Sequence, residues 1–140
     1  MTALFECFVE GDPAPKGSYR AVPHRRTGAA VLINDAVGGA SWAHTMAVMF
    51  RAAYEGKTPL DGPVHVRLTF FLRRGRSVKR RYPTVKPDLD KLQRNCLDAL
   101  VTAGVLRDDA LVVVIQATKH YTDDSRTPGV VVGVWRDSEE

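Results

Sequence analysis

The sequence predicts an α+β domain, a two-layer α/β sandwich in which two helices cover one face of a mixed sheet of about four strands. Alternating apolar residues mark the strands, and apolar residues at three- and four-residue spacing mark two helices. The elements follow one another as strand, helix, strand, helix, strand, strand, an order typical of layered α/β folds. With 140 residues, 44% of them hydrophobic and 26% charged, the chain is expected to form one domain over residues 1–140.

The first part of the chain is expected to supply one strand, a basic loop and one helix. Residues 3–10 alternate as a strand, and the loop after them holds apolar pieces that can pair as a hairpin about residues 24–28. The first helix is predicted over residues 42–54, with Ser41 as its N-cap and Gly56 closing it. Its apolar face contains Trp42, Met46, Met49, Phe50 and Ala53.

The middle of the chain begins with an alternating strand over residues 64–72, which leaves His65 on the strand surface. Residues 73–86 (RRGRSVKRRYPTVK) follow at once, with seven Lys or Arg and no acid. Such a segment is expected to make no packing contacts and to repel itself, so a basic mobile arm is predicted. It is interpreted as a phosphate-gripping arm, with a merely solvated loop as the alternative.

The second helix is predicted from Leu89 or Asp90 to Gly104, because apolar residues recur at helical spacing and glycine suits the left-handed closing position. Next comes a strand over residues 111–118 that is apolar on both faces at its start, which suggests a central strand or one covered by a partner subunit. Residues 130–135 are expected to return from it as a hairpin.

Charge divides the chain into a basic and an acidic part. Residues 1–86 hold 14 Lys or Arg against 6 acids, and residues 87–140 hold 6 against 10. A basic surface beside an acidic pocket suits a nuclease, because phosphates are attracted by one and cut at the other. No apolar run is long enough to cross a membrane, the two cysteines fit a reducing cytoplasm as buried hydrophobes, and no Cys/His spacing suggests zinc.

Four acids flank the second helix: Asp88 and Asp90 at its start, and Asp108 and Asp109 beyond its end. Asp88 is expected in extended chain just before the helix, since Pro87 is tolerated only in a first turn. If carboxylates from the two ends converge, they form an oxygen-ligand site for Mg²⁺ or Mn²⁺. The alternative is that Asp88 and Asp90 are ordinary acids favoured by the helix dipole.

The segment DLDKLQRNCLDALVTAGVLRDDALVV resembles the signature of RusA-type Holliday-junction resolvases, small endonucleases common in phages and prophages. The family pattern has an Asp-Leu/Ile-Asp-Asn/Lys-Leu opening, a helix with Asp-Ala-Leu, and Asp-Asp before a Val-rich strand. All of it is present in register, and PAPKGSYR resembles the family's N-terminal segment. The strong match covers residues 86–114.

The resemblance implies that Asp88, Asp90 and Asp109 hold Mg²⁺, which Mn²⁺ can replace, with Asp108 in a less certain role. Where the family has a catalytic lysine this chain has Arg94, which keeps the positive charge but cannot give up a proton. Asp98, one helical turn further on, is expected to orient Arg94. The predicted DNA contacts are Lys16, Arg20, Arg73, Arg74, Arg76, Lys79, Arg80, Arg81 and Lys86.

The implied activity is metal-assisted hydrolysis of a four-way DNA junction by paired symmetric nicks, in DNA recombination and repair, by a cytoplasmic homodimer in a bacterial or phage-infected cell. Three alternatives stay open. One is a non-catalytic module that binds branched DNA, the second is a nuclease for flaps or forks, and the third is a small assembly protein whose aspartates only cap a helix.

Overall fold

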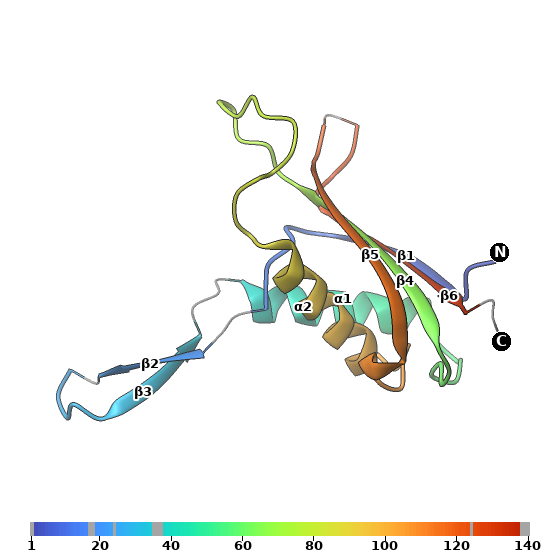
Figure 1. The fold of residues 1–140 in the computed structure, drawn as a ribbon, viewed down its shortest axis with the longest axis horizontal. Helices are drawn as coiled ribbons and strands as arrows, with labels where there is room; N and C mark the ends of the chain where they lie inside the picture. Colours follow the sequence, from blue (N-terminus) through green and yellow to red (C-terminus); the bar gives the residue numbers. More distant parts are fainter. Residues whose placement is uncertain (1, 17–18, 24, 35–37, 124, 138–140) are drawn as a thin grey trace.

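The computed structural model describes residues 2–16, 19–23, 25–34, 38–123 and 125–137, and for residues 19–23 and 30–34 the backbone alone. Two layers are visible in Figure 1: a four-stranded sheet, and two helices packed on one of its faces. The strands are β1 (Phe5–Glu10), β4 (Val64–Leu72), β5 (Val112–Tyr121) and β6 (Gly129–Arg136). The predicted two-layer α+β fold is confirmed.

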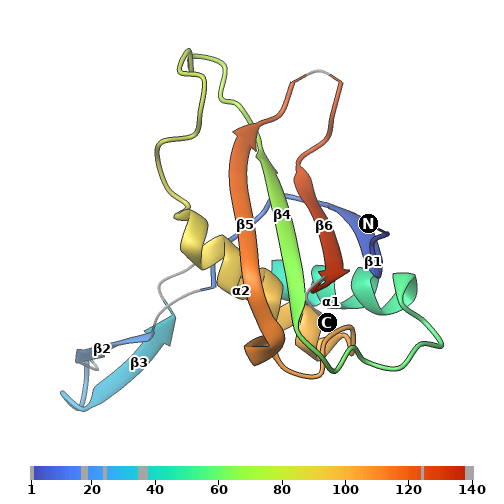
Figure 2. The same ribbon diagram turned by 45° about the vertical axis from the view of Figure 1, so that its right-hand side comes forward.

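The sheet has the order β1-β6-β4-β5. β6 is antiparallel to both of its neighbours, whereas β4 and β5 run parallel, so the sheet is mixed. Alternation along β4 explains its place in the middle: Val64, Val66, Leu68 and Phe70 are each at most 2% exposed and face the helices. Among the described residues, no helix lies on the other face of the sheet (Figure 2).

Two predictions about the last strands were wrong. β5 is an edge strand, so the expected central position is wrong, whereas the other alternative, cover by a partner subunit, stays a prediction; Val113 and Val114 are 58% and 43% exposed. β6 does not form a hairpin with β5, because β4 lies between them and pairs with both. The error has a physical reason: a chain reversal fixes the direction of the returning strand but not which strand it will pair with.

Helix α1 (Gly39–Ala53) begins earlier than predicted, with Gly38 in a left-handed conformation (φ 80°) as its N-cap. Ser41 therefore lies inside the helix, and its predicted role as a cap is wrong. The buried side chains Trp42, Met46, Phe50 and Tyr54 recur every fourth residue. A strip of this spacing drifts by about 40° per step. It leaves Met49 and Ala53, which were expected in the core, exposed on its flank.

Helix α2 (Leu89–Thr102) confirms the predicted start and ends two residues before Gly104. Asp88 precedes it in extended conformation (φ −70°, ψ 137°), and Gly104 turns the chain with φ 80°. Leu92, Cys96 and Leu100 are fully buried against the sheet and α1. The predicted hairpin in the basic loop is also confirmed, since β2 (Tyr19–Pro23) and β3 (Ala30–Asn34) pair as a separate two-stranded sheet.

One polar side chain, Asn95 of α2, is buried in the part of the chain that the structure describes, with 4% of its surface exposed. Its amide nitrogen donates to the carbonyl oxygens of Ala14 and Gly39, both at 3.1 Å. These two bonds fasten the segment after β1 and the start of α1 to α2.

Replacing Asn95 with Leu is expected to lower the free energy of unfolding by about 2 kcal/mol, because two carbonyl groups lose their donor, one in a buried and one in a partly buried hydrogen bond. Urea denaturation monitored by circular dichroism measures the change. The control is Gln93→Leu on the same helix, because the Gln93 side chain is only half-buried. That control should change stability by no more than about 0.5 kcal/mol. Equal losses in the two variants would contradict the role given to Asn95.

Candidate functional site

The N-terminal end of α2 presents two exposed carboxylates. Asp88 is the residue before the helix, and Asp90 lies in its first turn. The chain that delivers Asp88 is fastened to the sheet by Lys119 of β5, whose ammonium donates to the carbonyl oxygens of Val85 (2.8 Å) and Pro87 (2.9 Å). The two acids therefore sit at a defined place beside the sheet edge.

The second acidic group lies beyond the other end of α2. Asp109 opens a short 3₁₀ turn, and the carboxylate of Asp108 accepts a hydrogen bond from the backbone N–H of Ala110 (3.0 Å). That bond lowers the pKa of Asp108. The pKa of Asp109 is raised, first by its hydrogen bond to the Asp108 carboxyl and further by the charges of Asp108 and Asp98. Asp109 therefore keeps its proton to a higher pH than an isolated aspartate, whereas Asp108 loses its proton at a lower pH.

The chain after α2 is held at the start of the sheet. The N–H of Leu60, just before β4, donates to the carbonyl of Val105 (2.8 Å), and the N–H of Arg107 donates back to Leu60 (3.0 Å). Asp108 and Asp109 are thus fixed near the beginning of β5, whereas Asp88 is tied by Lys119 near the end of β5. Figure 1 shows the chain entering β5 beside the C-terminal end of α2, away from the end where α2 begins.

Two lengths show how far apart the acidic groups are. Helix α2 has 14 residues and therefore spans about 21 Å. The step along β5 from Val112 to Lys119 spans about 23 Å. Among the described residues, no group of three or more His, Cys, Asp or Glu side chains is placed to hold a metal ion. The predicted convergence of Asp88, Asp90 and Asp109 within one chain is therefore wrong, because a straight helix separates them; their role as ligands stays a prediction.

Helix α2 also carries Arg94 and Asp98, which were expected to pair. The structure instead pairs the Asp98 carboxylate with the ammonium of Lys16, from the segment after β1. Arg94 is exposed on the same helix, between the two acidic ends. Lys16, predicted to contact DNA, thus already has an acidic partner in the protein.

The basic arm, residues 73–86, is a loop with contacts of its own. The guanidinium of Arg74 donates to the carbonyls of Val78, Arg80 and Arg81, and Arg73 forms an ion pair with Asp12 (2.8 Å). The prediction that this segment makes no packing contacts is wrong; its mobility stays a prediction. The remaining predicted phosphate contacts in the arm are all exposed: Arg76, Lys79, Arg80, Arg81 and Lys86. The side chain of Arg20 lies outside the described residues.

The sequence model of the family described as Endodeoxyribonuclease RusA matches residues 11–134. The chain belongs to the RusA endodeoxyribonuclease family. The match includes both acidic ends of α2 and the basic arm. No curated protein matches the chain individually. Within the described residues, neither α1 nor α2 is long and apolar enough to cross a membrane.

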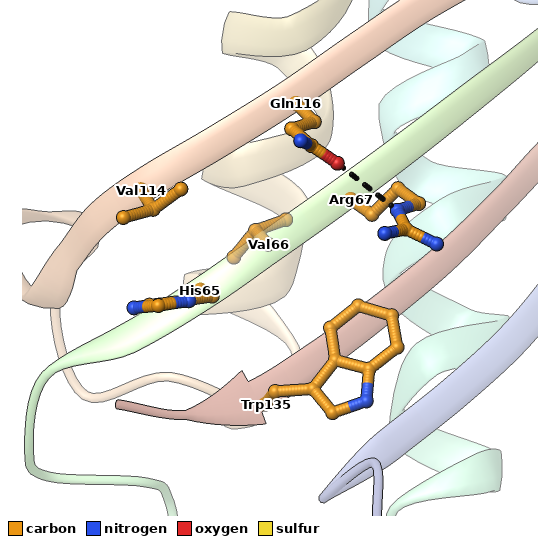
Figure 3. A pocket seen from close by; sticks show the side chains of 6 residues that line it. All are labelled: His65, Val66, Arg67, Val114, Gln116 and Trp135. Atoms are coloured by element: carbon orange, nitrogen blue, oxygen red, sulfur yellow. Dashed lines mark hydrogen bonds between the residues drawn. The ribbon is translucent and has the colours of Figure 1, made fainter. Parts of the chain in front are cut away.

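A cavity of about 330 Å³ lies on the sheet face without helices (Figure 3). Arg67 lines it, donating to Gln116 (3.2 Å) and lying 5.4 Å from the ring centre of Trp135. At its margin His65 contacts the Asp137 carboxylate (3.0 Å). Because α2 lies on the opposite face, this cavity is separate from the acidic residues at the two ends of α2.

Sequence reasoning missed Lys119. On β5, every second side chain faces the core, and Ile115 and Ala117 pack there. Lys119 is the next residue of this alternation, so a charged residue stands where the pattern predicts an apolar one. That break was the available signal. What the lysine binds depends on the path of the arm, which the pattern does not show.

Proposed function

We propose that this RusA-family chain is a Mg²⁺-dependent endodeoxyribonuclease that resolves four-way DNA junctions by paired nicks, in recombination and repair of bacterial or phage DNA in the cytoplasm. The observation that carries the proposal is the pair Asp88 and Asp90, exposed at the start of α2, immediately after a loop rich in Lys and Arg. Phosphates held by the basic loop would lie beside carboxylates suited to a hard divalent cation.

The ligand chemistry fits Mg²⁺, but the geometry within one chain does not, because Asp109 lies at the far end of α2. We therefore propose that two copies complete each site, with Asp88 and Asp90 from one chain and Asp109 from its partner. When bound, the cation supplies charge stabilisation at the phosphate and lowers the pKa of a bound water. A two-fold dimer has two such sites, as paired nicks require.

The open edge of β5 offers a route to this dimer. The strand begins with the uncharged segment VVVIQAT, whereas exposed edge strands are usually protected by charged residues or proline. Antiparallel pairing of two β5 edges about a two-fold axis sets the start of one strand against the end of the other. That arrangement brings the Asp109 end of one copy towards the Asp88 end of its partner.

The chain's other cations have distinct roles in this proposal. Arg94, exposed on α2 between the two acidic ends, offsets charge that develops on the phosphate but donates no proton. Arg76, Lys79 and Arg81 contact the DNA backbone, so binding depends on branched shape more than on base sequence.

Arg81 and Lys16 are expected to differ in their effect on junction binding. Arg81→Ala should lower the slope of log K against log salt concentration by about 1, because one phosphate contact is lost. Lys16→Ala should leave the slope nearly unchanged, since Asp98 already neutralises Lys16. Fluorescence anisotropy at several salt concentrations, in the presence of EDTA, measures both. If Lys16→Ala lowered this slope as much as Arg81→Ala or more, the ion pair between Lys16 and Asp98 would have to open when DNA binds.

The function is tested with a labelled four-way junction incubated with the protein and Mg²⁺, and in parallel with EDTA. We expect symmetric nicks in two opposite strands with Mg²⁺, none with EDTA, and none in a linear duplex of the same sequence. If flaps or forks were cut in preference to four-way junctions, they would take the place of the junction as the proposed substrate. If the protein bound the junction but cut no DNA with Mg²⁺, the proposed nuclease activity would be refuted and only DNA binding would remain.

A further inference from the structure

The basic arm contacts the last three residues of β5 along much of its length. Near the start of the arm, the guanidinium of Arg74 lies 4.4 Å from the ring centre of Tyr121. In the middle, the ring of Tyr82 lies 6.0 Å from that of His120. At the end of the arm, Lys119 donates to the carbonyls of Val85 and Pro87. Three consecutive strand residues therefore contact the arm at three successive places.

The last of these contacts has the strongest chemistry. A lysine ammonium has three donors and no acceptor. Two of its donors here are given to carbonyls that bracket the Lys86–Pro87 bond. Both bonds are charge-assisted, and the bond to Pro87 is partly buried. The bonded residue Pro87 is the immediate neighbour of Asp88. Lys119 thus joins the end of the arm, the start of α2 and the sheet at one point.

We propose that Lys119 is a positioning residue that couples the phosphate-binding arm to the Asp88–Asp90 end of α2. Lys119 touches neither DNA nor metal in this role; it holds Asp88 in place relative to β5 and sets the angle at which the arm leaves the site. The role in cleavage rests on the proposed nuclease function. The tether between arm and strand does not, so the two are tested separately.

The variant Lys119→Met removes the ammonium and keeps most of the side-chain length. Limited digestion with trypsin, with cut sites mapped by mass spectrometry, reports opening of the arm, because the segment is rich in Lys and Arg. We expect trypsin to cut within residues 73–86 about tenfold faster in this variant, since the rate of proteolysis follows the population in which the arm is open. The matched control is Arg67→Met, which loses a cation and a hydrogen bond on the opposite face of the same sheet and should not change nicking.

The effect on catalysis is measured as the single-turnover rate of junction cleavage. Lys119→Met is expected to cleave about 10²-fold more slowly, because a small displacement of a reacting group has an effect of this size. The junction dissociation constant, measured in an Asp90→Asn background, should change little. Lys119→Arg keeps the charge and the donors. It should restore most of the rate of junction cleavage, and trypsin should again cut the arm slowly.

A second variant, Tyr121→Leu, removes the ring next to Arg74 and keeps the lysine. In this variant trypsin should cut faster near the start of the arm, and the rate of junction cleavage should stay almost unchanged. Two results would overturn the proposal. One is that Lys119→Met does not change the rate at which trypsin cuts the arm. The other is that the rate of junction cleavage falls as far in Tyr121→Leu as in Lys119→Met. If the unmutated protein cuts no junction, the nuclease proposal fails, and the trypsin result alone decides whether Lys119 tethers the arm.

Discussion

Asp90→Asn is expected to abolish junction cleavage, with a loss of about 10³-fold or more, because an amide cannot supply the charge that a divalent cation requires. Binding should persist or become tighter, since the variant removes a negative charge that repels phosphate. Single-turnover cleavage with Mg²⁺ measures the first effect, and anisotropy with the same labelled junction measures the second. The combination separates a catalytic role from a role in DNA binding.

The matched control is Glu55→Gln, which removes one carboxylate from an exposed position just after α1 and should leave cleavage unchanged. Asp90 is exposed as well, so neither variant is expected to shift the free energy of unfolding by more than about 0.5 kcal/mol. If Asp90→Asn cut junctions at the unmutated rate, Asp90 would be only an acid favoured by the helix dipole, and the metal site proposed at this end of α2 would be withdrawn.

Mixed dimers of Asp90→Asn and Asp109→Asn are expected to regain nicking that neither variant shows alone. In such a dimer, the first chain supplies Asp109 and the second supplies Asp88 and Asp90, so one of the two sites is complete. Random pairing of equal amounts would restore about one quarter of the complete sites of the unmutated protein. A site built within one chain predicts no recovery at all, because every chain then lacks one ligand.

The experiment is sharpest with co-expressed chains that carry different tags, purified successively on both tags to isolate the mixed dimer. A supercoiled plasmid that extrudes a cruciform gives two distinguishable products. The unmutated enzyme should linearise it by paired nicks, whereas the mixed dimer should yield nicked circles, since it has one complete site. Inactive mixed dimers would contradict the shared site and return attention to metal ligands within a single chain.

Much of the fold was predictable because its signals are local. The alternation in β4, the helical spacing in α2, Pro87 before Asp88 and the left-handed turn at Gly104 each depend on a few neighbouring residues, and the structure confirms them. The pairing of β6 with β4 was not predictable in this way. Which strand becomes a neighbour depends on which apolar faces must be buried together across the whole domain.

The candidate site divides along the same line. Its residue types and the element that carries each of them follow from the chain's own patterns: aspartates before and after one amphipathic helix, and a block of Lys and Arg ahead of it. Their distances do not follow, because the pairing of Leu60 with Val105 and Arg107 decides where the chain goes after α2, and because Lys119 and Asp98 take partners remote in sequence. Chemistry was readable from local sequence, whereas the separation of the carboxylates and the anchoring of the arm arise only when distant segments pack around one core.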